Sequence, residues 1–399
     1  MKKIVLLSLI ASSMLMAGGY KIPETSLNGV ALSAANIAHN KSADAAYYNP
    51  ANMVFMEDTN HMEVDLTYIG LDPINYKGTH ALTGPMNHDI DSKSESFFIP
   101  SVHYVSGKAG ETRIGLSICA PGGLSKRWDD MPAVYSAEEF TLQAVEINPT
   151  VAIPINDKLA VAFGFRIVHS EGIVKSTSPG GSRDMTADSI DYGYNFALAY
   201  KPTTDLEMAF TYRSQINLTE EGNAKLYSDA GATKIYDGGG TLTIPLPAFA
   251  SFAVAYTLPS KTTVEFVYER NMWSAYKNLD FGYDSPMPAA FDDPIAKDWK
   301  DTNAFRLGIT QELDNMTLMA GMVYDETPVP EKTVGFELPD SNSFSVSLGG
   351  RYQVNDKIEV GLAALYSMRE SRTVKNDSLD GEFSNGNVLI VSTGVSYKF

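Results

Sequence analysis

Residues 343–354 read SFSVSLGGRYQV, and this stretch decides the fold class. Apolar side chains recur at every second position, at Phe344, Val346 and Leu348, while Ser345 and Ser347 between them are small and polar. Successive side chains of a β-strand point to opposite faces, whereas a helical face repeats about every 3.6 residues. The stretch therefore predicts a β-strand with one apolar face.

The same alternation ends the chain. Residues 387–399 place Leu389, Val391, Val395, Tyr397 and Phe399 on one face. A terminal aromatic residue is typical of the last strand of outer-membrane barrels, where the barrel assembly machinery reads it. After residue 17, no stretch of the chain reaches the roughly eighteen consecutive apolar residues that a membrane-spanning helix needs, so helical spans are excluded. Apolar strand faces without such helices indicate a transmembrane β-barrel.

Fourteen segments of the chain carry this pattern, an even number as bacterial barrels require. They lie near 61–69, 97–106, 111–120, 141–153, 158–170, 189–200, 205–217, 241–258, 261–272, 302–313, 315–325, 342–354, 357–369 and 387–399. Short turns alternate with long connections near 70–96, 121–140, 171–188, 218–240, 273–301, 326–341 and 370–386. An open edge in lipid would leave backbone groups unpaired, so the sheet must close. We expect an all-β, antiparallel barrel of fourteen strands spanning residues 59–399.

The chain begins with an expected signal peptide. Residues 1–17 carry a basic start and then a short apolar run, the layout of a secretory signal. Residues 18–58 break the alternation and are rich in Ala, Ser and Asn, with no face suited to lipid. We interpret 18–58 as a hatch inside the lumen, because a barrel of fourteen strands is too wide to be filled by its own wall. A periplasmic tail is the alternative interpretation.

Composition excludes several functions. The formal net charge of -17 makes nucleic acid an improbable partner. None of the six histidines falls in a metal-ligand spacing, and no cofactor motif occurs, so neither a metal nor a cofactor is expected. Ser101 and His103 share one strand face, which leaves an outer-membrane lipolytic enzyme as a rival that we disfavour. The chain is not expected to be an enzyme.

Charged and aromatic residues also have expected places. Six charged residues on polar strand faces are expected mostly to pair with one another inside the lumen: Arg166, Arg213, Glu265, Glu269, Arg306 and Arg351. Three tryptophans, Trp128, Trp273 and Trp299, lie in or beside long connections. They fit an interfacial girdle or, alternatively, simple loop packing.

A run of motifs resembles the FadL/TodX family of outer-membrane transporters of hydrophobic compounds. The strongest is Asn49-Pro50-Ala51, preceded by the acidic and alanine-rich run at 43–48. Similar stretches follow in the expected order at 120–125, 148–152, 320–329 and 338–340. The resemblance covers nearly the whole chain after the signal peptide, and it implies a monomer in the outer membrane of a Gram-negative bacterium, in contact with lipid and lipopolysaccharide.

The resemblance also implies a mechanism of passive uptake. The ligand would be a long-chain fatty acid or, alternatively, an aromatic or aliphatic hydrocarbon, captured at the connections 171–188 and 218–240. Tyr20 and Ile22 would lie on its path, although Lys21 departs from the family's uncharged residue. Pro121, Gly122 and Gly123 would form a lateral opening in the wall, since proline and glycine weaken a strand ladder. An ordinary strand end at this place is the alternative, and a general porin is a further rival.

Overall fold

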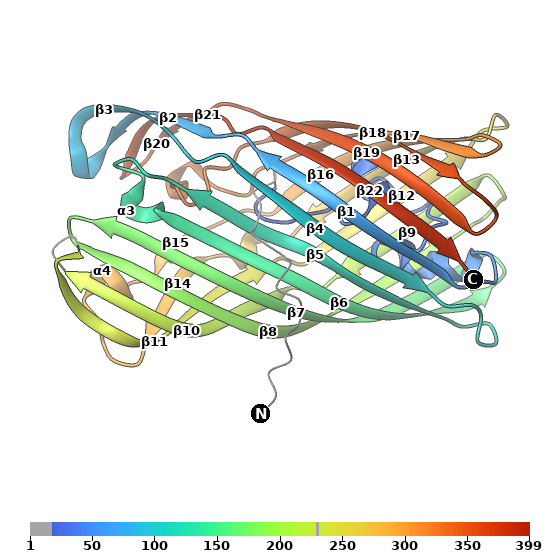
Figure 1. Cartoon of the computed structure of the whole chain (residues 1–399), viewed down its shortest axis with the longest axis horizontal. Coiled ribbons are helices and arrows are strands. Elements are labelled where there is room, and N and C mark those ends of the chain that lie inside the picture. The colour runs from blue at the N-terminus through green and yellow to red at the C-terminus, as the bar shows by residue number, and fades with distance from the viewer. Residues whose placement is uncertain (1–17, 229–230) are drawn as a thin grey trace.

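Fourteen antiparallel strands close into a barrel (Figure 1). The computed structural model describes residues 18–228 and 231–399, so the expected signal peptide lies outside the described residues. Each strand pairs with the next around the ring, and the last pairs with the first, which confirms the predicted fold class and strand number. In ring order they are β1 (His61–Leu71), β4 (Glu95–Val105), β5 (Arg113–Arg127), β6 (Glu139–Asn156), β7 (Leu159–Ser178), β8 (Gly181–Tyr200), β9 (Leu206–Arg213), β12 (Phe249–Thr257), β13 (Thr262–Asn271), β16 (Thr302–Glu312), β17 (Met316–Asp325), β18 (Ser343–Gln353), β19 (Ile358–Arg369) and β22 (Val388–Lys398).

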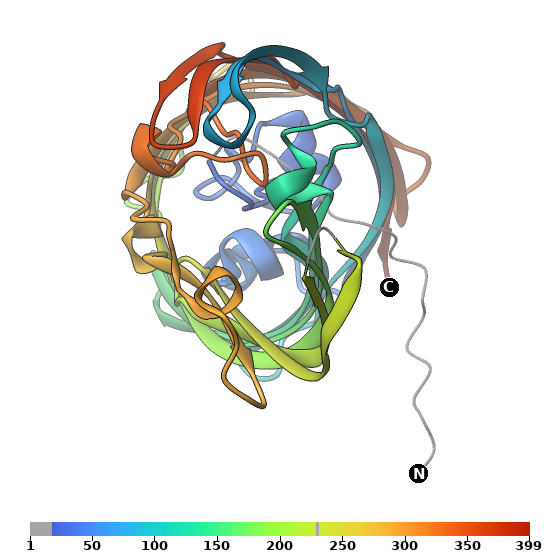
Figure 2. The same ribbon diagram turned by 90° about the vertical axis from the view of Figure 1, so that its left-hand side faces the viewer.

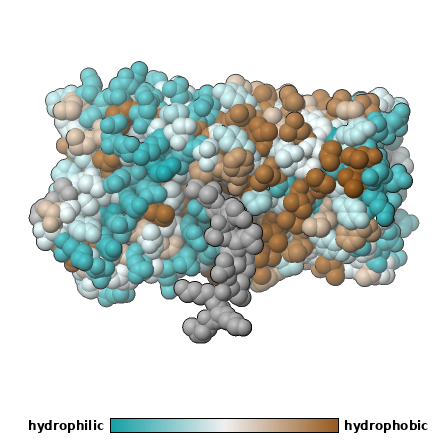
Figure 3. Space-filling view, viewed as in Figure 1, coloured by the Kyte–Doolittle hydropathy of each residue, from teal (hydrophilic) through white to brown (hydrophobic). Residues whose placement is uncertain are grey.

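The period of two corresponds to an outward and an inward face. In β18, Leu348 is 68% exposed whereas its neighbour Ser347 is 7% exposed. Apolar side chains gather over the half of the outer surface that lies on the right in Figure 3, and the other half is largely hydrophilic. Among the described residues, no helix has the length and apolar character needed to cross a membrane. The apolar part of the outer surface is formed by the outward side chains of the strands, such as Leu348 of β18.

The two ends of the barrel differ in build. At the short-turn end, on the right in Figure 1, tight turns such as 354–357 join neighbouring strands. At the long-loop end, strands project beyond the apolar surface and carry a separate four-stranded sheet. The elements of this end are β2 (Ile74–His80), η2 (Ala81–Thr83), β3 (Gly84–Asp91), α3 (Val134–Ala137), η4 (Trp273–Ala275), β14 (Asn278–Tyr283), α4 (Ala289–Asp292), β15 (Ile295–Ala296), η5 (Glu331–Thr333), β20 (Arg372–Lys375) and β21 (Leu379–Asn385).

Two predicted loops and one predicted strand were wrong. The connection 171–188 is mostly the extended hairpin of β7 and β8, and 218–240 is largely β10 (Ile216–Ser228) with the first half of β11 (Thr233–Leu246). The segment 241–258 is not one strand: it divides between β11 and β12 at Pro247, which has no N–H to donate to a ladder. The outer parts of these strands lie beyond the apolar surface, so their outward face meets water. Their inward face still buries apolar side chains such as Met185, Leu218 and Leu242.

The hatch segment (residues 18–58) lies inside the ring of strands, as the dark blue ribbon in Figure 2 shows. Residues 18–38 and 43–53 are all buried. The segment contains α1 (Leu27–Ala31), α2 (Ala45–Tyr48) and η1 (Pro50–Phe55). Ser26 caps α1 by accepting a hydrogen bond from the Gly29 N–H, and Asn49 caps η1 by accepting one from the Ala51 N–H. Small residues and capped short helices let the chain turn repeatedly within the lumen.

Candidate functional site

Tyr20 fills an apolar pocket in the lumen towards the long-loop end. Its ring packs against Trp273 at 4.7 Å, Trp299 at 5.6 Å and Tyr276 at 6.3 Å between ring centroids. Its hydroxyl donates a hydrogen bond of 2.5 Å to the Pro245 carbonyl, and burial raises the pKa of Tyr20 well above its usual value. The cavity left beside the ring measures about 10 Å³. With Tyr20 in place, the pocket has room for no more than about one water molecule.

Two glycines allow the chain to reach this pocket. Gly18 and Gly19 adopt φ values of +82° and +81°, a region that L side chains disfavour. A Cβ on Gly19 would lie 2.6 Å from the Trp273 ring, so no other residue fits there. The Gly19 N–H donates a hydrogen bond of 3.2 Å to Asp340, a buried carboxylate whose pKa is raised chiefly by that burial. The approach to Tyr20 is thus fixed by backbone contacts.

The residues after Tyr20 pair with the barrel wall. Lys21 forms an antiparallel bridge with Gly122 of β5. The Ile22 N–H donates to the Pro121 carbonyl at 3.0 Å, and the Gly123 N–H donates to the Tyr20 carbonyl at 2.8 Å. The structure therefore brings the predicted residues Tyr20 and Ile22 next to the predicted residues Pro121, Gly122 and Gly123.

At this place β5 is irregular but does not end. Its register against β6 shifts between Cys119 and Gly122, which is the bulge expected at Pro121, and the strand then continues to Arg127. The prediction that the third strand stops at residue 120 was therefore wrong. Proline interrupts the ladder locally, yet the following residues resume it because β6 continues alongside them.

The ladder between β4 and β5 is incomplete. The two strands pair only from Val102–Ile118 to Val105–Gly115. Beyond that point, towards the long-loop end, Glu95 of β4 accepts hydrogen bonds from the side chains of Ser125 and Arg127 of β5. The wall between these strands is therefore held by side chains where a backbone ladder is absent. Apolar side chains lie behind this part of the wall, among them those of Ile22, Phe97, Ile99 and Ala120.

A second cavity opens above the pocket. It measures about 210 Å³ and lies between α3, the β7–β8 hairpin and the β14 region, with Phe281 and Phe291 among its lining residues. Three residues, Phe140, Lys297 and Glu337, line both this outer cavity and the Tyr20 pocket. Lys297 is 4% exposed and forms an ion pair with Glu337. The sequence did not reveal this pair, because its members are forty residues apart in connections without periodicity.

The tryptophans do not form an interfacial girdle. Trp128 and Trp273 are 0% exposed and Trp299 is 5% exposed. Trp273 and Trp299 pack on Tyr20, and Trp128 donates a hydrogen bond of 3.0 Å to the Phe336 carbonyl. The girdle was therefore the wrong interpretation and packing the right one. These connections fold inwards over the lumen and bury their large aromatic side chains around the pocket.

The charged residues of the wall are bonded inside the lumen, but of the six predicted residues only Arg306 and Glu269 pair with one another. The others have partners outside that set. Glu146 of β6 accepts hydrogen bonds from both Arg166 and Arg213. The remaining four predicted residues also point inwards. Arg306 lies 3.2 Å from Glu269, Arg351 lies 2.8 Å from Glu63, and Glu265 accepts the N–H groups of Ile37 and Ala38 at 2.6 and 2.7 Å.

The hatch segment joins this network. The Lys21 ammonium lies 2.6 Å from Glu269 and over the Phe249 ring. Glu24 lies 3.9 Å from Arg306, but burial dominates and raises the pKa of Glu24 to about 7. The unexpected charge at Lys21 is thus neutralised by a carboxylate of the wall.

Asn49 of the Asn-Pro-Ala run supports the turn at residues 36–40. Its side-chain amide donates a hydrogen bond of 2.9 Å to the Ile37 carbonyl, and Asn52 donates to the same carbonyl at 2.9 Å. The Ile37 N–H in turn donates to Glu265 of β13. The motif therefore links a short helix to a turn that is itself fixed to the wall.

Ser101 and His103, the predicted catalytic rival, do not interact as a nucleophile and base. The His103 ring bonds Ser117 at 3.1 Å and the Thr25 carbonyl at 3.2 Å, while Ser101 donates to Asp65 at 3.4 Å. Both residues are buried under the hatch segment. Among the described residues, no group of three potential metal-ligating side chains converges.

Comparison with known families accounts for this arrangement. The family described as "Outer membrane protein transport protein (OMPP1/FadL/TodX)" matches residues 8–399. The chain belongs to this family. It is therefore an outer-membrane transporter of hydrophobic compounds in a Gram-negative bacterium.

Individual relatives are distant in sequence and similar in fold. The long-chain fatty acid transport protein of Escherichia coli O6:H1 is 23% identical, over 98% of this chain and 96% of its own. Outer membrane protein P1 of Haemophilus influenzae is 22% identical, over 90% of this chain and 89% of its own. A FadL homologue of Pseudomonas aeruginosa superposes with a TM-score of 0.85 at 18% identity, over 96% of this chain and 100% of its own. The toluene transporter TbuX of Ralstonia pickettii superposes with a TM-score of 0.73 at 17% identity, over 94% of this chain and 98% of its own.

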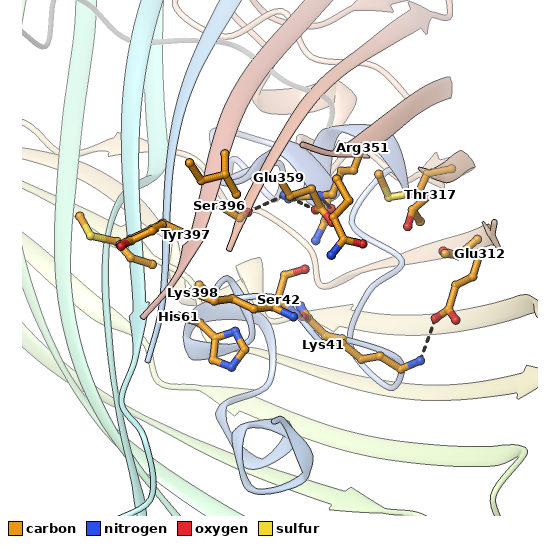
Figure 4. A pocket seen from close by; sticks show the side chains of 18 of the residues that line it. Lys41, Ser42, His61, Glu312, Thr317, Arg351, Glu359, Ser396, Tyr397 and Lys398 are labelled. Carbon is orange, nitrogen blue, oxygen red and sulfur yellow. Dashed lines mark hydrogen bonds and ion pairs between the residues drawn. The ribbon is translucent and has the colours of Figure 1, made fainter. Parts of the chain in front are cut away.

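Membership of this family orients the barrel. Outer-membrane barrels have short periplasmic turns and long extracellular loops, so the short-turn end faces the periplasm. A polar cavity of about 250 Å³ opens at that end, between the hatch segment and the wall (Figure 4). Several of its charged side chains are paired, for example Lys41 with Glu312 at 2.8 Å and Arg351 with Glu359 at 3.3 Å. Most of the residues that line it are polar or charged, whereas most of those around Tyr20 are apolar or aromatic.

Proposed function

We propose that this protein takes up long-chain fatty acids passively, by capture at its extracellular loops, displacement of Tyr20 and lateral release through the wall. The observation that carries the proposal is the direct link between the pocket and the wall. Tyr20 fills the apolar pocket, while the backbone of Tyr20 to Ile22 pairs with the irregular part of β5. A movement of Tyr20 out of the pocket would therefore also pull on the backbone contacts between residues 20–22 and β5.

Capture would take place in the outer cavity between α3 and the β7–β8 hairpin. Its aromatic lining offers apolar surface to a ligand arriving from the extracellular side. Since Phe140, Lys297 and Glu337 line both cavities, the Lys297–Glu337 ion pair stands between the outer cavity and the Tyr20 pocket. A ligand would pass this pair to go further.

Entry into the pocket requires Tyr20 to leave. A cavity of about 10 Å³ cannot hold an alkyl chain. Burying a methylene group is worth about 0.8 kcal/mol, so a chain of about fifteen methylene groups gains on the order of 10 kcal/mol before its ordering costs. The burial and ring contacts of Tyr20 are together worth about 3–6 kcal/mol. The ligand can therefore displace the tyrosine.

Release would follow from that displacement. Withdrawal of residues 20–22 would break their hydrogen bonds to Pro121 and Gly123 and uncover the part of the wall that has no β4–β5 ladder. An apolar ligand would gain by moving sideways into lipid rather than into the polar cavity on the periplasmic side. The hatch segment would close the straight route, and no energy source would be needed.

A second candidate ligand class is an aromatic or aliphatic hydrocarbon taken by the same route. The observation that favours it is the apolar and aromatic lining around Tyr20. A general porin would need an open lumen, and the buried hatch segment argues against one. We further propose that the protein is a monomer, is inserted by the barrel assembly machinery and lies among outer-membrane lipid and lipopolysaccharide.

The test is uptake by a deletion strain that is complemented with variants. We expect the wild type to restore growth and uptake on long-chain fatty acids, and a toluene-like substrate tests the alternative. Gly123→Arg places a guanidinium in the wall opening and should abolish uptake while the barrel still assembles. Gly107→Arg is the matched control. Gly107 lies in a periplasmic turn, and the nearest atom to a Cβ added there would be 3.6 Å away. Unchanged uptake by Gly123→Arg would contradict lateral release, and a large steady single-channel conductance of the wild type would favour a porin.

A further inference from the structure

A second ladder of the wall is incomplete, the one between β8 and the strands next to it, which lie side by side towards the long-loop end (Figure 1). β8 pairs with β9 as far as Asn195 and with β10 from Asp188 onwards. Between these two ladders, residues 189–193 have no ladder partner among residues 215–220, although the structure describes both stretches. The cause is a change of neighbour: β9 ends at Arg213, and the chain then pairs on its other side with β11 instead of β12. This unpaired part of the wall is called the β8–β10 break below.

Side chains span the β8–β10 break. At its inner end, the Tyr194 N–H donates to the Ser214 hydroxyl at 2.9 Å. Further out, the Thr219 N–H donates to the Asp191 carboxylate at 3.1 Å. These contacts can break without disturbing a continuous backbone ladder, so this part of the wall separates more easily than the rest.

The Ile216 side chain closes the break on the lumen side. A Cβ added to Gly193 would lie 2.7 Å from Ile216 Cδ1, so the isoleucine packs directly on the backbone of β8. Ile216 is buried and belongs to the same apolar cluster as Tyr20. Leu218, the next residue on this face, is the register partner of Ile244, which lines the Tyr20 pocket. A run of apolar side chains therefore connects the break with the pocket.

The outer side of the break lies at the extracellular border of the apolar surface. Ile190, Tyr192 and Tyr194 of β8 point outwards and are 59%, 61% and 58% exposed. Phe165 of β7 stacks on Tyr192 with ring centroids 5.8 Å apart. Aromatic girdles of this kind mark the membrane interfaces of outer-membrane barrels. On the β10 side the outward residue Asn217 is polar and exposed, so lipid reaches the break but does not extend far beyond it.

Two carboxylates lie at the break. Asp191 spans it, and Glu220, which is 0% exposed, lies on the lumen face of β10 beside its outer end. The basic residues of β7 next to this part of β8 already have acidic partners. His169 lies 3.3 Å from Glu171, and Arg166 lies 2.9 Å from a carboxylate oxygen of β6. A ligand carboxylate would therefore be repelled here, whereas an uncharged ligand would not.

We propose that the β8–β10 break is a lateral entrance through which an uncharged hydrophobic ligand dissolved in the outer leaflet reaches the Tyr20 pocket. The proposal rests on the proposed function in one respect, namely that this pocket binds the ligand. Displacement of Ile216 from Gly193 opens the wall, and Leu218 and Ile244 then offer the ligand a continuous apolar surface. Such a ligand bypasses the outer cavity, which remains the route for a carboxylate.

Quenching of tryptophan fluorescence by brominated ligands measures this entry. Bromine quenches at short range, and the three tryptophans of the chain, Trp128, Trp273 and Trp299, are all buried. A probe that stays in lipid leaves them unquenched. 1-Bromohexadecane is the uncharged probe, and 16-bromohexadecanoate has the same chain with a carboxylate. With purified barrels in phosphatidylcholine vesicles, the rate of quenching reports how fast each probe passes from lipid to the pocket.

Ile216→Ala removes the side chain that closes the break. We expect it to raise the rate for 1-bromohexadecane several-fold and to leave the rate for 16-bromohexadecanoate unchanged. Ile309→Ala is the matched control, because Ile309 is an outward isoleucine of β16 that is 41% exposed. Heat-modifiable migration in electrophoresis verifies that each variant is folded.

A disulfide tests closure of the same entrance. The Asp191 side chain contacts the backbone of Thr219, so Asp191→Cys combined with Thr219→Cys places two thiols across the break. The oxidised variant should admit 1-bromohexadecane several-fold more slowly than the same variant after reduction. Asp191→Asn keeps an acceptor for the Thr219 N–H and removes the charge, so it should speed the entry of 16-bromohexadecanoate several-fold.

Other outcomes overturn the proposal. A rate for 1-bromohexadecane that responds neither to Ile216→Ala nor to the disulfide would show that it enters elsewhere. Equal responses of both probes to Ile216→Ala would refute the selection of uncharged ligands. Wild-type barrels in which neither probe quenches would refute the proposed function itself, whereas quenching that is insensitive to these variants would refute only the entrance.

Discussion

The backbone of Lys21 pairs in antiparallel orientation with that of Gly122. The hatch segment thereby forms an isolated bridge with β5 at the point where the ladder to β6 shifts. Tyr20 on one side of this bridge fills the pocket, and Ile22 on the other side lies behind the part of the wall that has no β4–β5 ladder. Three successive residues therefore join the site where a ligand would bind to the place where it would leave.

Gly122→Val should break the bridge between Lys21 and position 122 and so release residues 20–22 from β5. A Cβ at position 122 would lie 3.0 Å from both Leu246 Cδ2 and the Tyr20 carbonyl oxygen, and valine adds two methyl groups to it. We expect faster hydrogen exchange at residues 20–22. Hexadecanoate should bind several-fold more tightly, because binding no longer has to displace Tyr20.

Hydrogen exchange with mass spectrometry checks the first expectation. Quenching of tryptophan fluorescence by added hexadecanoate checks the second, since Trp273 and Trp299 pack on Tyr20. Gly107→Val, in a periplasmic turn, is the control. Exchange at residues 20–22 that equals that of the wild type would show that the bridge does not hold the segment in place.

Glu146→Gln should destabilise the barrel more than any surface change. Glu146 is 0% exposed and is the shared counter-charge of Arg166 and Arg213, both of which are also buried. Removing its charge leaves two guanidinium groups in the lumen without their carboxylate, a loss of about 3–5 kcal/mol for a broken buried pair. The urea midpoint of unfolding in detergent should fall accordingly. Glu111→Gln, in an exposed periplasmic turn, should leave the midpoint unchanged. Equal midpoints for the two variants would contradict the assigned role.

Docking of the hatch segment should weaken as the pH rises through about 7. Burial raises the pKa of Glu24 from 4.5 to about 7, and Arg306 offsets only part of that effect. A raised carboxyl pKa means that the neutral form is favoured in the folded protein. The contribution of neutral Glu24 to stability is fully present below 4.5, the pKa of this group in the unfolded chain. It is lost as the pH rises through about 7. Exchange protection at residues 21–25 should therefore be greater at pH 5 than at pH 8, after correction for intrinsic rates. Glu24→Gln should remove the difference, and a difference that persists in that variant would assign it to another group.

The sequence predicted the parts of this structure that lipid determines. Leu348 and Ser347 alternate because one faces the membrane and the other faces the lumen, and such a contrast is local in the chain. The strand β11 escaped prediction because its outer half lies beyond the apolar surface, so water meets both of its faces. Trp299 was misplaced for a related reason, since composition does not tell whether a connection folds outwards or over the lumen.

Contacts between distant residues could not be predicted at all. Lys297 and Glu337, the ion pair that lines both cavities, are forty residues apart in connections without periodicity. Each resembles an ordinary charged loop residue until these connections fold over the lumen. By contrast, the family resemblance singled out Tyr20, Ile22 and Gly122, although as separate parts of a ligand path and not as neighbours, because a resemblance carries information that periodicity lacks.

Asn49→Ala should loosen the turn that closes the periplasmic side of the lumen. The Asn49 amide donates to the Ile37 carbonyl at 2.9 Å, and its Oδ1 accepts the Ala51 N–H at 3.1 Å. Alanine removes both hydrogen bonds and leaves a buried N–H and a less well-bonded carbonyl, a cost of about 1–3 kcal/mol. Residues 36, 39 and 40 of this turn line the polar cavity at the periplasmic end. A loosened turn should connect that cavity with the lumen more often.

Single-channel recordings in planar bilayers measure this connection as brief openings, which Asn49→Ala should make more frequent without changing heat-modifiable migration. Asn49→Asp keeps the cap on Ala51 and loses the amide donor to Ile37, together with its long hydrogen bond of 3.5 Å to the Leu198 carbonyl. It should therefore open to a similar extent if these amide bonds are what matters. Recordings in which Asn49→Asp resembles the wild type would place the effect in the helix cap instead. Asn315→Ala, in an exposed periplasmic turn, provides the baseline.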